Sequence, residues 1–247
     1  MRTLPEEKPF LTAEWRYLVM LNYEIDPAVL QPYVPFGTEL DDYKGRTFAS
    51  MVGFLFYDTR VLGVSIPFHR NFEEINLRFY VKREVGQELR CGVVFIKEIV
   101  PRRAIAWIAN ALYGENYVAL RTRGRLEFES FENISPSYVS YEWRHKGKWS
   151  QLSLSASGAP QELAAGSEEE FITEHYWGYT RRSPTQTTEY RVHHPRWRIW
   201  RAESHQLTCD ISALYGENFA GALSQQPASA FLAEGSEVAV YKGRALT

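Results

Sequence analysis

The feature that most constrains the fold is a strict alternation of apolar and polar residues in the segment EINLRFYVK, residues 74–82. Successive side chains of a β-strand point to opposite faces, so this segment predicts a strand with one apolar and one polar face. Further strand patterns fill most of the 247 residues, and 15% of them are aromatic. Aromatic residues favour strands, so a mainly β fold is expected. The apolar face comprises Ile75, Leu77, Phe79 and Val81.

Helix patterns are few and short. Residues 102–113 carry apolar side chains at helical spacing on most of their surface, and Gly114 follows where a glycine commonly ends a helix. We expect this helix to be well buried. A second helix is predicted from the capping box of Ser167 and Glu170, with its end at Gly178. These observations predict an α+β fold, mainly an antiparallel β-barrel with a few short helices.

The domain organisation follows from one loose stretch, SASGAPQELAAGS at 155–167, whose small residues are typical of a surface loop. Strand patterns lie on both sides of it, so it does not separate two different halves. We therefore expect a single domain over residues 1–247.

Charge and composition exclude several classes of partner. The net charge of −2 shows no basic excess, which argues against nucleic acid. No apolar run approaches the ~18 residues that a membrane span needs, and the opening MRTLPEEKPF lacks the apolar core of a secretory signal. Cys91 and Cys209 suit a reducing cytoplasm as thiols, with one disulfide as the alternative. We expect a cytoplasmic protein, and a homo-oligomer is compatible with the sequence.

Several segments resemble the uncharacterised bacterial YqjF-like family over nearly the whole chain. They are YEIDPAVLQPYVPFGTELD, EINLRFYV, GVVFIKEIVP, EHYWGYT and FLAEGSEVAVYKG. That family is in turn distantly similar to acetoacetate decarboxylase. The resemblance implies a cone-shaped antiparallel β-barrel that encloses a pocket.

The same resemblance implies a loss of the decarboxylase chemistry. In the decarboxylases a helix ends in Gly-aromatic-Pro-Lys-Lys, and the first lysine forms a Schiff base with the keto acid. If Gly114 matches that glycine, the lysine positions fall at Tyr117 and Val118, neither of which can supply an amine. A decarboxylase arginine falls at Glu24, whereas a family carboxylate corresponds to Glu74. The resemblance thus implies the fold without Schiff-base chemistry, and no cofactor is expected.

The pentapeptide Leu-Tyr-Gly-Glu-Asn occurs twice, at Leu112–Asn116 and Leu214–Asn218. True repeats share a whole structural unit, but the upstream flanks AIAWIAN and LTCDIS differ in apolar spacing. We interpret the repetition as chance reuse of a Tyr-Gly turn rather than as a duplication.

The polar face of the 74–82 strand carries the first candidate site residues, Glu74, Asn76 and Arg78. If this face lines a barrel interior, a carboxylate and a guanidinium meet in a pocket, pair with each other or with a ligand, and orient a polar or anionic molecule. If it faces solvent, the two charges form a surface ion pair. Pattern alone leaves both interpretations open, and the family match of Glu74 supports the first.

Further candidates lie on other segments. Lys97 is expected to share a strand face with Val93, Phe95 and Ile99, where it is either a desolvated amine nucleophile or a strand-end lysine that extends into water. His175 and Trp177, on the predicted second helix, are candidates for a pocket wall. None of the six histidines shows a metal-binding spacing, so no metal site is predicted.

Three hypotheses for function follow. The first is a barrel protein that binds a small organic molecule without Schiff-base chemistry. The second is an enzyme acting on a small polar or anionic substrate, with Glu74 as acid/base, Arg78 as anion clamp and Tyr117 as proton donor or hydrogen-bonding group. The third is a structural or oligomerisation module whose barrel is filled by side chains. The first two require an open cavity lined by these residues, and the third requires its absence.

Overall fold

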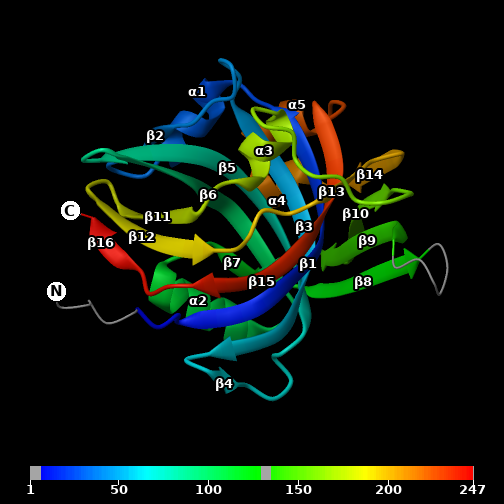
Figure 1. Ribbon diagram of the computed structural model, residues 1–247, viewed down its shortest axis with the longest axis horizontal. Coiled ribbons are helices and arrows are strands. Elements are labelled where there is room, and N and C mark those ends of the chain that lie inside the picture. The colour runs from blue at the N-terminus through cyan, green and yellow to red at the C-terminus, as the bar shows by residue number, and fades with distance from the viewer. Residues whose placement is uncertain (1–6, 129–134, 247) are drawn as a thin grey trace.

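The computed structural model of the protein describes residues 7–128 and 135–246. Within these ranges the chain forms one sheet of twelve strands, a second sheet of four strands and short helices (Figure 1). Seven strands of the large sheet follow one another in the order β15-β1-β3-β5-β6-β11-β12. Strand β12 then pairs back onto β15 through Val192 and Val240, which closes the ring. Only β6 and β11 run parallel among the neighbours in this ring.

The ring strands are long, and shorter strands extend them. The ring consists of β1 (Leu11–Glu24), β3 (Phe48–Val61), β5 (Phe72–Val85), β6 (Glu88–Val100), β11 (Trp177–Ser183), β12 (Gln186–His193) and β15 (Ser229–Val240). The additions to the same sheet are β2 (Glu39–Leu40), β4 (Val64–Ser65), β7 (Tyr117–Ala119), β13 (Ile199–Arg201) and β16 (Arg244–Leu246).

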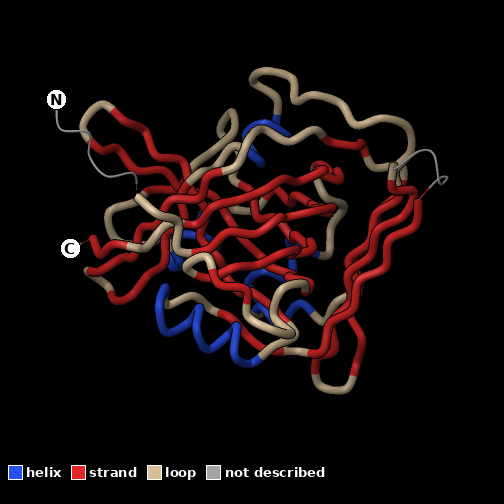
Figure 2. The backbone as a smooth tube through the Cα atoms, turned by 60° about the horizontal axis from the view of Figure 1, so that its bottom comes forward, coloured by secondary structure: helices blue, strands red, loops and turns tan. Residues whose placement is uncertain are grey.

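The second sheet stands beside the ring, at the right of Figures 1 and 2. Together with two short helices, α4 (Ile211–Tyr215) and α5 (Glu217–Leu223), it covers the apolar face of β5. Leu77 and Phe79 pack there in one cluster with Tyr141, Trp143 and Phe219. The cover is therefore this second layer and not the helix predicted at residues 102–113. The strands are β8 (Arg121–Phe128), β9 (Pro136–His145), β10 (Lys148–Ser155) and β14 (Ser204–Thr208).

Among the described residues, five α-helices and one 3-10 turn connect the strands. Helix α2 ends as predicted, with Gly114 in the left-handed conformation at φ 73°. The prediction that this helix is well buried is wrong for Trp107, which is 72% exposed, because α2 lies against the ring beside β7 instead of between the sheets. The helices are α1 (Pro27–Leu30), η1 (Gln31–Tyr33), α2 (Arg103–Tyr113), α3 (Glu168–Thr173), α4 (Ile211–Tyr215) and α5 (Glu217–Leu223).

Helix α3 begins at the predicted cap, where the Ser167 hydroxyl accepts from the Glu170 amide, but it ends at Thr173 instead of reaching Gly178. The backbone amide of Tyr176 donates to Cys91, and its carbonyl accepts from Val192. These strand contacts draw the chain into β11 before the helix can continue. Both Cys91 and Cys209 are free and partly buried.

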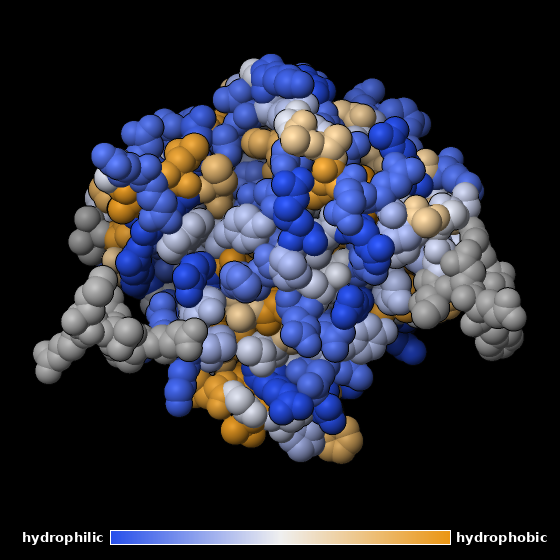
Figure 3. All heavy atoms as spheres, viewed as in Figure 1, coloured by the Kyte–Doolittle hydropathy of each residue, from blue (hydrophilic) through white to orange (hydrophobic). Residues whose placement is uncertain are grey.

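Apolar side chains reach the surface at the bottom of Figure 3, over the hairpin that joins β3 to β4. Leu62, Val64 and Phe68 are all exposed there, and Phe68 is 87% exposed. Among the described residues, none of the helices has the length and apolar character needed to cross a bilayer.

Candidate functional site

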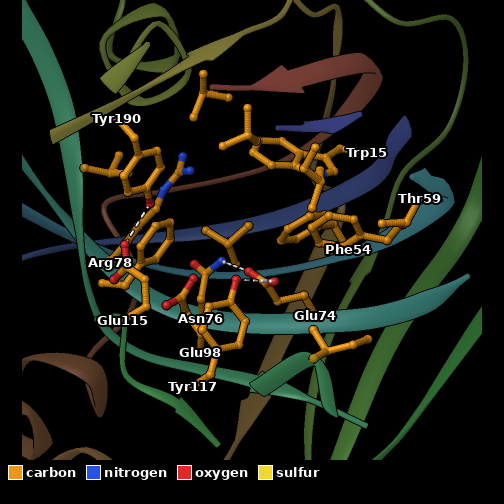
Figure 4. A pocket seen from close by; sticks show the side chains of 18 of the residues that line it. Trp15, Phe54, Thr59, Glu74, Asn76, Arg78, Glu98, Glu115, Tyr117 and Tyr190 are labelled. Atoms are coloured by element: carbon orange, nitrogen blue, oxygen red, sulfur yellow. Dashed lines mark hydrogen bonds between the residues drawn. The ribbon is translucent and has the colours of Figure 1, made fainter. Parts of the chain in front are cut away.

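The strand ring encloses a cavity of about 220 Å³ (Figure 4). Glu74, Asn76 and Arg78 project into it from β5, and all three are at least nine-tenths buried. Their inward direction follows from the fold, because the apolar side chains between them are held against the second sheet. The polar face of this strand is therefore the cavity wall.

Glu74 lies at the centre of a small hydrogen-bond network. Asn76 Nδ2 donates to Glu74 Oε1 at 3.0 Å, and Tyr117 Oη donates to Glu74 Oε2 at 3.0 Å. Burial raises the pKa of Glu74 from 4.5 to about 7, while these two donors and the Arg78 charge oppose the rise. A carboxyl group that titrates near neutral pH can both give and take a proton.

A β-bulge brings Glu98 of β6 into the same wall. Ile96 is an extra residue on β6, between Phe95 and Lys97, whose partners are adjacent on β5. Such a bulge changes which side chains face each side of a sheet. Glu98 consequently lies opposite Asn76 and points into the cavity. Burial, followed by the nearby negative charges of other glutamates, raises the pKa of Glu98 well above its usual range.

The same bulge turns Lys97 away from the cavity. Val93 and Phe95 line the cavity, whereas Ile99 packs in the cluster between the sheets and Lys97 Nζ donates to the Leu214 carbonyl. The prediction that Lys97 shares a face with Val93 and Phe95 is wrong, because alternation does not continue through a bulge. Burial lowers the pKa of Lys97, but its amine does not face the site.

Glu115 supplies a third buried carboxyl group from the turn after α2. Its Oε1 atom accepts from Tyr190 Oη at 2.8 Å and also from the Thr180 hydroxyl. Burial raises its pKa from 4.5 to about 7, against the effect of those two donors. The cavity thus holds three carboxyl groups, each from a different segment.

Arg78 is the basic side chain of this polar wall. Its Nη2 atom donates to the Ile172 carbonyl at 3.2 Å instead of pairing with Glu74. Of the two alternatives expected for Glu74 and Arg78, pairing with each other is not seen, and pairing with a ligand stays a prediction. The guanidinium carbon also lies 5.6 Å from the centre of the Tyr80 ring. Its Nε atom has no hydrogen-bond partner among the described residues.

His175 and Trp177 also line the cavity, although neither lies on a helix. His175 Nε2 is 3.4 Å from Asp41 Oδ2, and burial lowers the pKa of His175 against the pull of that carboxylate. Arg90 stacks on Trp177 with its guanidinium 4.2 Å from the ring centre. His194, which the sequence did not single out, stacks on the Trp197 ring at 4.1 Å.

The opposite part of the cavity is aromatic. The Trp15 ring centre lies 5.3 Å from that of Phe54 and 5.8 Å from that of Phe56, and Phe56 stacks on Phe72 at 4.6 Å. In Figure 4, Trp15 and Phe54 stand on the right, and Arg78, Glu115 and Tyr190 stand on the left. The aromatic end of the cavity adjoins the polar wall, because Phe54 and Glu74 are direct cross-strand partners.

Sequence reasoning missed Glu98 and Glu115 as site residues. Glu98 interrupts an apolar strand, and Glu115 follows the helix-ending glycine, so each carried a signal of an acid in an otherwise buried segment. Neither could be placed, because one depends on a bulge and the other on the packing of β11 and β12 around the turn.

A closed strand ring around a polar-walled cavity defines a class of small β-barrel proteins with an internal cavity. The chain belongs to the DUF2071 family, described as an uncharacterized conserved protein, whose sequence model matches residues 12–237. It is also 24% identical over 215 residues to the uncharacterized protein YqjF of Bacillus subtilis strain 168, which covers 87% of this chain and 85% of the relative. The predicted family is thereby confirmed.

Solved structures confirm the predicted fold. Acetoacetate decarboxylase from Legionella pneumophila matches with a TM-score of 0.66 and 14% identity, over 100% of this chain and 93% of that chain. The enduracididine biosynthesis enzyme MppR complexed with pyruvate gives 0.66 and 13%, over 100% and 93%. An acetoacetate decarboxylase-like enzyme from Sphingomonas wittichii RW1 gives 0.65 and 16%, over 98% and 94%. At these identities the likeness shows the fold alone.

Proposed function

We propose that the protein binds a small organic molecule in the cavity of the strand ring and does so without forming a Schiff base. The observation that carries this proposal is a set of buried polar atoms without a partner, which belong to residues that line the cavity. Asn76 Oδ1, Glu98 Oε2 and Arg78 Nε each lack a hydrogen-bond partner among the described residues. Leaving such groups unpaired costs about 1–3 kcal/mol each, so a bound molecule that satisfies them is strongly favoured.

The absence of an amine at the cavity wall supports the second half of the proposal. None of the described residues that line the cavity is a lysine, and Tyr117 occupies the position that the decarboxylase resemblance assigns to the nucleophile. Lys97, which the sequence offered as a candidate amine nucleophile, donates instead to the Leu214 carbonyl, away from the cavity. A cavity of about 220 Å³ also argues against a barrel filled by its own side chains.

Native mass spectrometry of the purified protein tests binding directly. We expect a retained small molecule, and we expect Ala104→Trp to lose it, because Ala104 is exposed and borders the cavity, where a large ring would block entry. Arg103→Trp is the matched control, since this neighbour on α2 does not line the cavity. Equal retention by the two variants would show that the molecule binds elsewhere.

Reductive trapping tests the chemistry. Incubation with acetoacetate and borohydride should leave the mass of the protein unchanged. A covalent adduct that maps to any lysine would refute the absence of Schiff-base chemistry, and an adduct at Lys97 would show that the side chain reaches the cavity in solution.

One observation favours a second function, general acid/base catalysis by Glu74. Its pKa of about 7 and its two fixed donors are what a proton-transfer group requires. The test is exchange of the α-protons of acetone in deuterated water, followed by NMR. Glu74→Gln should abolish any catalysed exchange, and Glu84→Gln, at the exposed end of the same strand, should retain it. Equal rates in the two variants would remove Glu74 from this role.

A further inference from the structure

The ionisable groups that line the cavity are strongly unbalanced between acids and bases. Glu74, Glu98 and Glu115 contribute three carboxyl groups, and Arg78 can balance one of them. Three histidines line the cavity, and one of them, His69, lies on the loop between β4 and β5. The other two do not correct the imbalance, because burial lowers the pKa of His175, and that of His194 to about 4. Ionising a second carboxyl group therefore requires a further cation inside the cavity.

The unpaired atoms identify what kind of group is missing. Asn76 Oδ1 is an acceptor, and Glu98 Oε2 is one whenever its carboxyl group is ionised. Neither atom has a hydrogen-bond partner among the described residues, and their residues are direct cross-strand partners on β5 and β6. Both residues are 2% exposed. Side chains directly opposite each other on one face of an antiparallel pair lie close together, so one donor group can serve both.

The carboxyl groups do not converge as a metal site would. Among the described residues, no group of three or more His, Cys, Asp or Glu side chains is placed to hold a metal ion. A nitrogen cation with several N–H donors needs only the two unpaired acceptors and the negative field of the remaining acids. The aromatic end of the cavity, with Trp15, Phe54 and Phe56, offers apolar contact to whatever carries that nitrogen.

We propose, on the basis of the function proposed above, that the ligand is a primary amine carried on an apolar group, with its ammonium donating to Glu98 Oε2 and Asn76 Oδ1. The apolar group then lies against the rings of Trp15 and Phe54. Arg78 keeps its contact with the Ile172 carbonyl and offsets one carboxylate, and the ammonium offsets a second.

A pH dependence follows from the groups around the ammonium. Binding of a cation lowers the pKa of neighbouring carboxyl groups, so protons leave when the amine binds. Because the pKa values of Glu74 and Glu115 are raised to about 7, amine affinity should rise between pH 6 and pH 8. The titratable and charged groups that line this space are Glu74 and Arg78 of β5, Glu98 of β6, His69, Glu115, Tyr117, His175, Tyr190 and His194.

Calorimetric titration with three matched compounds tests the proposal: 2-phenylethylamine, 2-phenylethanol and phenylacetate. At pH 8 we expect the amine to bind at least tenfold more tightly than the alcohol, and phenylacetate to bind most weakly. Titrations in two buffers that differ in ionisation enthalpy should show that protons are released when the amine binds, but not when the alcohol or phenylacetate binds. Equal or tighter binding of the alcohol or of phenylacetate would overturn the amine while supporting a small-molecule site.

Variants separate the specific contact from folding. Glu98→Gln keeps the side-chain volume and should lower amine affinity at least tenfold while leaving that of the alcohol within twofold. Glu84→Gln should change neither. Unchanged amine affinity in Glu98→Gln would overturn the assigned contact. If no compound binds but native mass spectrometry finds a retained molecule, the amine proposal fails and the proposed function stands; if nothing is retained either, both fail.

Discussion

The two copies of Leu-Tyr-Gly-Glu-Asn occupy very different surroundings. In the first copy Gly114 ends α2 and Glu115 turns into the cavity, buried at 7% exposure. In the second copy Gly216 separates α4 from α5, and Glu217 is exposed and accepts from the Ser212 hydroxyl at 2.9 Å. The same five residues therefore give a buried glutamate, Glu115, whose pKa is raised to about 7, and an exposed glutamate, Glu217, at the start of α5.

The residue after each copy sharpens the contrast. Tyr117 borders the cavity and directs its hydroxyl at Glu74, whereas Phe219 is wholly buried and its ring centre lies 5.5 Å from that of Tyr33. The difference teaches that this pentapeptide specifies a turn and nothing more. What the turn does depends on the layer that packs over it, which supports chance reuse over duplication.

The largest expected effect is on the free energy of unfolding, when the residue that follows each copy, Tyr117 or Phe219, is replaced by alanine. Phe219→Ala should lower the free energy of unfolding by about 3–5 kcal/mol, because it opens a hole in the core between the sheets. Tyr117→Ala should cost less than about 2 kcal/mol, since its ring already borders open space. Urea denaturation of both variants measures the difference. Equal costs would mean that the two positions are packed alike.

Replacing Gly114 or Gly216 by alanine should lower the free energy of unfolding by similar amounts, but for different reasons. Both have positive φ, 73° for Gly114 and 99° for Gly216, so alanine should cost about 1–3 kcal/mol at each position. A methyl group at Gly114 would also meet Arg182 Nη1 at 1.9 Å, whereas at Gly216 it would meet nothing within 4 Å.

A double-mutant cycle with Arg182→Ala separates the two causes. The cycle should show a coupling of about 1 kcal/mol with Gly114→Ala and none with Gly216→Ala. Additive costs at both glycines would show that Arg182 moves aside freely.

The two glutamates should differ in how stability depends on pH. The pKa of Glu115 is raised from 4.5 to about 7, so the folded state holds a proton that the unfolded state has lost. Its contribution to stability is therefore full below pH 4.5 and is lost as pH rises to about 7. Glu115→Gln should recover on the order of 1–3 kcal/mol at pH 8 relative to pH 4.5.

Glu217→Gln is the control for this prediction, because the residue is exposed. Its unfolding free energy should follow the wild-type pH profile within about 0.5 kcal/mol. Thermal unfolding across pH 4–9 provides the measurement. A Glu115→Gln profile parallel to that of the wild type would show that Glu115 is solvated in solution.

The smallest expected effect is on the pKa of Glu74. Tyr117→Phe removes a donor that favours the ionised form, so this pKa should rise further above about 7, by about 0.5–1. Titration of ¹³C-labelled glutamate carboxyls by NMR detects the change. Tyr215→Phe, at the tyrosine of the second copy, should leave Glu74 unaffected. A fall in the pKa after Tyr117→Phe would contradict the hydrogen bond seen here.

Much of the fold could be predicted because its signals are local. The alternation of β5, the cap at Ser167 and the stop at Gly114 depend on residues within a turn or two of each other, and each appears in the structure. The wrong helix end at Gly178 shows the limit. Backbone bonds from Tyr176 to β6 and β12 override the local preference there.

The candidate site was predictable only in part. Alternation alone fixed Glu74, Asn76 and Arg78 on one face, and the resemblance to the decarboxylases suggested that this face is inward. Placing Glu98 required the bulge at Ile96, which no local pattern reveals.

By itself the sequence determined which segments become strands, where helices stop and which side chains share a face, because these follow from the geometry of a few consecutive residues. The tertiary structure decided which face of β5 packs against the second sheet and which face lines the cavity. It also decided that Glu98 and not Lys97 enters the cavity, and that only one of the two identical pentapeptides carries a buried glutamate. Those outcomes depend on the pairing of β5 with β6 and on a second sheet supplied by residues far along the chain. Burial and cross-strand register are set by partners distant in sequence, so they arise only when the whole ring closes.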